Sequence, residues 1–128
     1  MNINTVILPS NGHLIFLESE RTVNFHVKRM YVICGVKAGE HRGYHAHKNL
    51  KQVLFCPYGK IEILLDDGKE RASIILDSPQ KGLIIEKEWR EILWLQDNSV
   101  LCVLASDYYD EDDYIRDYDD FLRSAKCK

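Results

Sequence analysis

The stretch GEHRGYHAHKNLKQ, from Gly39 to Gln52, decides the fold because it places two histidines, one residue apart, shortly after a glycine turn. Residues i and i+2 of a β-strand project to the same face, about 7 Å apart. On a strand, His45 and His47 would therefore direct both imidazoles into one space. Such a pair can bind a divalent metal, exchange protons near neutral pH, or simply face solvent from an edge strand.

Short apolar runs separated by turn residues make up most of the chain, a pattern typical of antiparallel sandwiches and barrels. We expect strands at 3–8, 14–18, 28–36, 44–47, 52–56, 60–65, 72–77, 83–86, 91–95 and 100–105. The connections are too short for the crossovers of a parallel sheet. The sequence therefore predicts a single all-β domain, 1–128, of ordinary size.

The acidic segment DYYDEDDYIRDYDD, 107–120, holds eight carboxylates against one arginine. Such a run is usually a solvated face or a tail, but aromatic residues interleave it here. Ile115, Tyr118, Phe121 and Leu122 recur at helical spacing. We therefore expect a short C-terminal helix that docks on the β domain by its aromatic face.

Composition excludes several classes of function. A net charge of −3 gives no basic field for nucleic acid, and no run approaches the roughly 20 apolar residues of a membrane span. The N-terminus has no basic leader, so we expect a cytoplasmic protein. Cys34, Cys56, Cys102 and Cys127 are far apart and form no CxxC, so we expect neither a disulfide framework nor a zinc knuckle.

The glycine and histidine spacing resembles the first cupin motif, in which a glycine precedes His-x-His, a glutamate and a second glycine. Gly39, His45, His47 and Gly59 match, but Gln52 stands where the glutamate is expected. The resemblance implies a cupin-type antiparallel β-sandwich or barrel, a jelly roll. Metal cupins take a further histidine from the C-terminal half, yet all five histidines here precede residue 48. Two imidazoles and an amide make a poor Zn²⁺ or Fe²⁺ site, so we expect no metal and interpret the pair as proton-transfer groups.

Leu8 to Leu122 resembles the sugar-nucleotide 3,4-ketoisomerases, small cupins that act on dTDP-4-dehydro-6-deoxyglucose. The resemblance is carried by FHVKRMY (25–31), RGYHAHK (42–48) with Gln52, LDDG (65–68), PQKGL (79–83), WRE (89–91) and LASDYYDEDDYIRDYDDFL (104–122). It implies an isomerase without cofactor that moves the keto group from C4 to C3 through an enediol. Its product would be a dTDP-3-dehydro-6-deoxyhexose for amino-deoxysugars of O-antigens, S-layers or other glycans.

The same resemblance implies roles for single residues. His45 would abstract the C3 proton, His47 would help to deliver a proton or bind substrate, and Tyr31 would act as acid or oxygen-stabilising donor. The candidate diphosphate ligands are Arg29, Arg42, Lys48 and Arg90. Strict alternation puts Arg42 and Lys48 on the strand face opposite His45. Gln52 could bind a sugar hydroxyl, or it could be a polar residue satisfied inside the barrel. Trp89 could wall the sugar site or cover the base, but core packing would explain it equally well.

Two other functions stay open from the sequence. A sugar-nucleotide 3,5-epimerase would share the barrel and the enolisation, but it would normally use a His-Asp dyad and a separate tyrosine. A non-catalytic metal- or sugar-binding cupin would show no proton exchange at C3 or C4. Strands such as VLCVLA that are apolar on both faces, together with the family resemblance, favour a homodimer. The gluco or galacto configuration of the product stays open.

Overall fold

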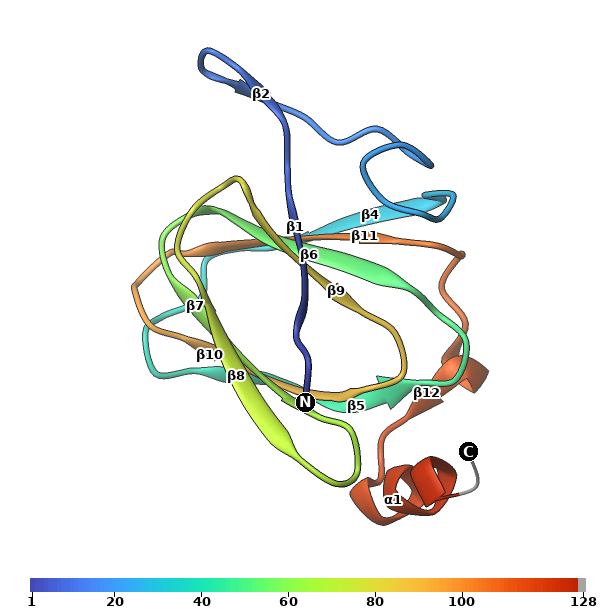
Figure 1. Ribbon diagram of the computed structural model, residues 1–128. Coiled ribbons are helices and arrows are strands. Elements are labelled where there is room, and N and C mark those ends of the chain that lie inside the picture. The colour runs from blue at the N-terminus through green and yellow to red at the C-terminus, as the bar shows by residue number, and fades with distance from the viewer. Residues whose placement is uncertain (127–128) are drawn as a thin grey trace.

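The computed structural model describes residues 1–126, in which two five-stranded antiparallel sheets pack face to face (Figure 1). The first sheet has the order β1 (Asn4–Ile7), β9 (Lys81–Ile85), β6 (Gln52–Tyr58), β11 (Val100–Ala105) and β4 (Arg29–Ile33). The second has the order β12 (Tyr114–Ile115), β5 (His41–His47), β10 (Trp89–Trp94), β7 (Ile61–Asp66) and β8 (Arg71–Leu76). The expected cupin-type sandwich is therefore confirmed.

Three short elements complete the architecture. A hairpin of β2 (Ser10–Asn11) and β3 (Leu14–Ile15) projects from the sandwich at the top of Figure 1. After β11, the chain passes through the 3₁₀ helix η1 (Glu111–Asp113) and β12 into the helix α1 (Tyr118–Lys126). No helix among residues 1–126 is long and apolar enough to span a bilayer. Cys127 lies outside the described residues.

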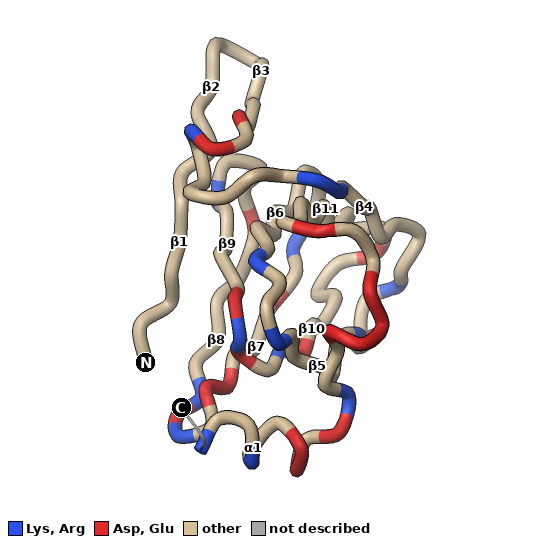
Figure 2. The backbone as a smooth tube through the Cα atoms, turned by 90° about the vertical axis from the view of Figure 1, so that its right-hand side faces the viewer, with Lys and Arg blue, Asp and Glu red and all other residues tan. Residues whose placement is uncertain are grey.

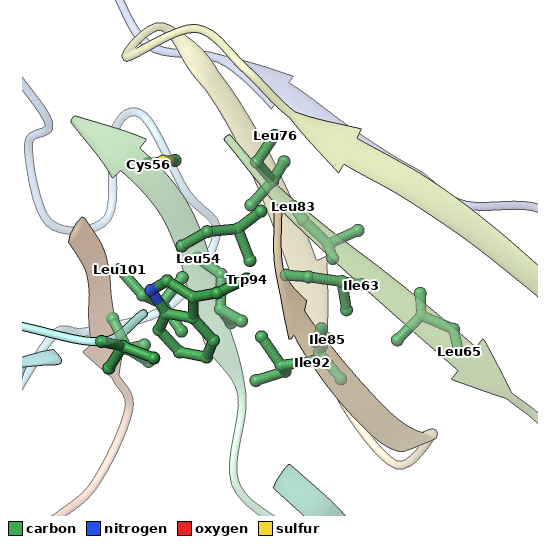
Figure 3. Packing of buried hydrophobic residues seen from close by; sticks show 13 residues of the cluster. Leu54, Cys56, Ile63, Leu65, Leu76, Leu83, Ile85, Ile92, Trp94 and Leu101 are labelled. Atoms are coloured by element: carbon green, nitrogen blue, oxygen red, sulfur yellow. The ribbon is translucent and has the colours of Figure 1, made fainter. Parts of the chain in front are cut away.

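The core between the sheets is built from the inward-facing positions of the strands. Trp94, fully buried, lies at its centre, and its indole nitrogen donates to the carbonyl of Ser99 at 2.8 Å. Figure 3 shows the aliphatic side chains that surround it. Some of these core residues, including Leu54 and Ile92, also line the space that remains open between the sheets.

The outer faces of both sheets are partly covered by the chain itself. Val23 and Phe25, from the connection before β4, pack on Val53 of β6. On the other sheet, Phe121 of α1 packs on Ala46 and Trp89. The apolar residues on both faces of β6 and β11 are thus explained in part within one chain.

The C-terminal helix is confirmed, but it begins later than the helical spacing suggested. Asp117 caps it, because its carboxylate accepts a hydrogen bond of 3.0 Å from the Asp120 amide. Ile115 precedes the helix and lies in β12, opposite Ala46 of β5. The acidic segment therefore crosses the edge of β5 before it becomes helical, which brings it to the histidines.

Candidate active site

A cavity of about 300 Å³ opens between the sheets and is lined in part by Leu54, Ile92 and Leu101, which belong to the core around Trp94. Five of the side chains expected at the site line it, namely Arg29, Tyr31, Arg42, His45 and Arg90. Tyr114 and Arg116, which were not singled out from the sequence, also line it. The sequence thus singled out five of the residues that line this cavity, but not the segment that carries Tyr114 and Arg116.

The two histidines point inward from the same face of β5, as their spacing predicted. Their ring centroids lie 4.9 Å apart, and the ring of Tyr114 packs 5.0 Å from His45 and 4.4 Å from His47. Ala46, between them, faces the opposite way and packs beneath α1. The alternative in which both rings face solvent on an edge strand is therefore wrong.

Both imidazoles are neutral near pH 7. Burial, reinforced by the positive charge of Arg90, lowers the pKa of His45 to about 4 and that of His47 to about 2. His45 hydrogen-bonds to the backbone of Gly43, and Nδ1 of His47 lies 3.0 Å from Oδ2 of Asp113. The Nε2 atoms of both rings are buried and have no hydrogen-bond partner within residues 1–126. Each ring therefore presents one unused nitrogen.

Tyr31, Gln52 and Arg90 form a hydrogen-bonded chain along the wall of the cavity. Gln52 donates to the Tyr31 hydroxyl oxygen at 3.2 Å and accepts from Nη1 of Arg90. Burial raises the pKa of Tyr31, so the phenol stays protonated, and its own proton is free to be donated.

Arg90 is the cation of this wall and is only 2% exposed. Burial lowers its pKa to about 10, which still leaves it charged at neutral pH. Its Nε and Nη2 atoms have no partner among the described residues. A buried cation with free donors is costly unless an anion occupies the space beside it, so Arg90 marks a position for negative charge.

A β-bulge changes the side from which Arg42 projects. Arg90 pairs with His45 and Glu91 with Gly43, so Tyr44 has no partner across the strands. Gly43 and Tyr44 both adopt positive φ, +92° and +57°. The extra residue reverses the alternation, so Arg42 lines the same cavity as His45. The expectation that it faces the opposite side is wrong.

Three residues expected to bind substrate do not line the cavity. Gln52 is fully buried behind its wall, and both ends of its amide are already used by Tyr31 and Arg90. Trp89 lies on the outer face of β10 under α1, which is the core-packing alternative. Lys48 is exposed just beyond β5, and its backbone amide donates to the Asp113 carbonyl. Gln52 therefore positions Tyr31 and Arg90. Trp89 packs under α1, and Lys48 bonds through its backbone to the Asp113 segment.

The segment that sequence reasoning missed supplies Asp113, Tyr114 and Arg116. Figure 2 shows the charged stretches that run from β11 down to α1. The Arg116 guanidinium lies 4.2 Å from the centroid of the Tyr114 ring, and Glu111 holds it through hydrogen bonds of 2.9 to 3.3 Å. The available signal was the aromatic residues within the acidic run, but these indicated only docking.

Within residues 1–126, no group of three or more His, Cys, Asp or Glu side chains is arranged to hold a metal ion. The residues that line the cavity instead include the neutral imidazole of His45, a phenol and a buried guanidinium, and the His47 ring lies behind that of His45, 4.9 Å from it. These groups suit proton transfer next to a developing negative charge.

Comparison with known proteins places the chain among enzymes of one kind. The chain is 47% identical over 118 residues to a TDP-4-oxo-6-deoxy-alpha-D-glucose-3,4-oxoisomerase from Aneurinibacillus thermoaerophilus, covering 91% of this chain and 85% of that protein. It superposes on a 3,4-ketoisomerase from Helicobacter canadensis with a TM-score of 0.93 and 43% identity, covering 98% of both chains.

A mutant of QdtA, a 3,4-ketoisomerase from Thermoanaerobacterium thermosaccharolyticum, has been solved in complex with TDP-4-keto-6-deoxyglucose. It gives a TM-score of 0.94 at 39% identity, covering 99% of this chain and 96% of that one. The family model described as "FdtA: WxcM-like, C-terminal" matches residues 2–126. The resemblance seen in the sequence motifs is thus confirmed, and the chain belongs to the FdtA/WxcM-like family.

Proposed function

We propose that the protein is a 3,4-ketoisomerase that converts dTDP-4-dehydro-6-deoxyglucose into a dTDP-3-dehydro-6-deoxyhexose. The observation that carries the proposal is a single cavity in which neutral His45 faces buried, charged Arg90 and protonated Tyr31. Such a site supplies a base, an anion-stabilising cation and an acid. The 47% identity to a protein named as this isomerase supports the same reaction.

The reaction requires four proton movements. The C3 carbon loses a proton and the C4 carbon gains one, while the C3 hydroxyl loses a proton and the C4 oxygen gains one. The enediolate between these steps carries negative charge on oxygen. One acid/base group for the carbons, another for the oxygens and a fixed cation for the enediolate are sufficient.

His45 is the group that we assign to C3, because its unpartnered Nε2 belongs to a ring that lines the cavity. We assign the oxygen-bound protons to His47, whose ring lies 4.9 Å away and is almost inaccessible to solvent. Tyr31 lies on β4, in the sheet opposite β5. It is the donor on the facing wall.

Arg90 is assigned to the enediolate oxygen and not to the diphosphate suggested by sequence. It is fully enclosed, and its unpaired donors lie beside the proton-transfer groups. A diphosphate is large and strongly hydrated, so it suits the exposed arginines of the cavity. Arg42 and Arg116 are both exposed and both line it. We assign the diphosphate to these two, with Arg29 as a third candidate.

The deciding experiment is incubation of the purified protein with dTDP-4-dehydro-6-deoxyglucose in D₂O with EDTA, followed by NMR. We expect a 3-keto product that carries deuterium. Unchanged substrate, a 3,5-epimerised product, or activity lost only with EDTA would contradict the proposal. His45→Asn should abolish turnover while the thermal unfolding transition stays intact.

The same spectra report the configuration at C4. In the galacto product, the new C4 hydrogen lies on the ring face from which the C3 hydrogen left, whereas in the gluco product it lies on the opposite face. A galacto product would therefore indicate return of the proton from the His45 wall. A gluco product would indicate delivery from the Tyr31 wall.

The epimerase alternative is not favoured. An epimerase would be expected to have a His-Asp dyad, and the His47–Asp113 pair is one. The dyad therefore does not distinguish the two reactions. The identity to named 3,4-ketoisomerases favours isomerisation. A homodimer is part of our proposal and is supported by apolar side chains left exposed on β4. The cytoplasmic location stays a prediction.

A further inference from the structure

We infer that Asp113 is a positioning residue, which fixes the tautomer of His47 and stabilises the imidazolium that forms on it during the reaction. The inference rests on the proposed ketoisomerase function and deepens it. It concerns a residue of the acidic segment that the motifs around the histidines do not contain.

The carboxylate of Asp113 is held in place from several directions. Oδ2 lies 3.0 Å from Nδ1 of His47, and Oδ1 accepts the backbone amide of Asn49 at 2.8 Å. Its backbone carbonyl accepts the amide of Lys48 at 2.9 Å. The next residue, Tyr114, pairs with His47 across β12 and β5. The amides of Lys48 and Asn49, which follow His47, and the pairing of Tyr114 with His47 therefore fix the position of this acid.

The His47–Asp113 pair is shielded from solvent, so water does not compete strongly for its hydrogen bond. The side chain of His47 is 1% exposed and that of Asp113 is 15% exposed. An ionised carboxylate only accepts hydrogen bonds, so the proton of neutral His47 must reside on Nδ1. Nε2, which is buried and has no hydrogen-bond partner among the described residues, then carries the lone pair. Asp113 thus makes Nε2 of His47 a proton acceptor and not a donor.

This tautomer matches the step assigned to His47. Nε2 would take the proton from the C3 hydroxyl, giving an imidazolium whose Nδ1–H points to the Asp113 carboxylate. The same proton would then pass from Nε2 to the C4 oxygen, and the ring would return to its neutral form. No proton is gained or lost overall, and Asp113 need not change its protonation state.

Asp113→Asn is the informative substitution, because an amide cannot satisfy both of its partners. One side of the amide donates, so it must either oppose the Asn49 amide or donate to Nδ1 of His47. The second arrangement forces the proton of His47 onto Nε2. We expect conversion to the 3-keto product to fall by about 10²–10⁴-fold, the contribution of a positioned acid/base group.

The readout that separates positioning from structural support is deuterium exchange at C3 of recovered substrate. His45 and Arg90 remain in Asp113→Asn, so the enediolate can still form and be reprotonated at C3. We therefore expect exchange in D₂O to persist in Asp113→Asn and His47→Asn while conversion is lost. His45→Asn should lose both. Equal loss of exchange and conversion in Asp113→Asn, or unchanged conversion, would overturn the inference.

Asp112→Asn is the matched control, because it removes a neighbouring exposed carboxylate with the same change in charge. It should convert and exchange like the wild type. A second measurement, independent of turnover and of the variant's folding, is ¹⁵N NMR of His47 in the wild-type protein. We expect the Nδ1–H tautomer, and observation of the Nε2–H tautomer would contradict the assignment. Absence of conversion by the wild-type protein would instead contradict the proposed function.

Discussion

At the scale of single residues, Arg90 links the electrostatics of the cavity to those of the reaction. Its charge helps to keep His45 and His47 neutral before substrate binds. When the enediolate forms, the same charge has an anion beside it, and its effect on the imidazoles is offset. The base is therefore unprotonated in the free enzyme and becomes a better proton acceptor as the reaction proceeds.

Arg90→Gln should consequently change the pH dependence as well as the rate. The base works only when neutral, so the acid limb of kcat/KM in the wild type should lie near the His45 pKa of about 4. Removing the positive charge raises that pKa, so the limb should move upward toward the ordinary histidine value of about 6.5. Turnover should fall by about 10²–10³-fold. Steady-state pH profiles check this, with the exposed Arg123→Gln as control. A limb that does not move would contradict the assignment.

At the scale of elements, the C-terminal segment of η1, β12 and α1 completes the site on the β-sandwich. β12 contributes only two residues to the sheet, yet it carries Tyr114 onto both histidines and places Asp113 beside one of them. Its position depends on α1, which is anchored by Phe121 and by the Tyr118 hydroxyl on Asp66.

Phe121→Ala should therefore loosen the segment before it affects the barrel. Truncating a buried phenylalanine costs about 3–5 kcal/mol, and Phe121 is the buried side chain of this short helix, whose Tyr118, Leu122 and Ala125 are only partly buried beside it. We expect a large loss of turnover, with faster hydrogen exchange in residues 107–126 and little change in the strands. Exchange mass spectrometry alongside activity checks this, with Arg123→Ala as the surface control. Full activity with an undocked helix would contradict it.

The limits of sequence-based prediction also lie at this scale. The strands and the shared face of His45 and His47 follow from local alternation, so they were predictable. The strand face on which Arg42 lies was not predictable, because the bulge requires Tyr44 at positive φ, which local propensity disfavours. The role of Asp113 was not predictable either, because it is one of eight carboxylates in the acidic segment. Only the pairing of β12 with a strand 67 residues earlier distinguishes it.

At the scale of the whole molecule, the outer face of the first sheet is covered unevenly. Val23 and Phe25 cover its β6 side, whereas Met30 and Val32 on the edge strand β4 are 63% and 48% exposed. Both neighbour apolar residues of β11, Leu104 and Cys102. A contiguous apolar surface on an exposed edge strand is typical of an interface, so a second copy of the chain is the expected partner.

Val32→Glu should separate the expected dimer without unfolding the chain, because Val32 faces away from the core between the sheets. Light scattering after size exclusion should give about twice 14.9 kDa for the wild type and 14.9 kDa for the variant. Ile75→Glu, which introduces the same charge at an exposed position of β8, should leave the mass unchanged. A monomeric wild type, or a dimeric Val32→Glu, would contradict the expected interface.

The position of the closing segment in the chain also orders events during synthesis. Residues 1–105, which contain all the strands of the first sheet and both histidines, leave the ribosome before Asp113, Tyr114 and Arg116. Domains can begin to fold while translation continues at about 5–20 residues per second. A chain that ends at residue 105 has both histidines but lacks their carboxylate partner and aromatic cover. The chemistry therefore depends on residues that follow the last strand of the first sheet, so a chain truncated after β11 should lack catalytic activity.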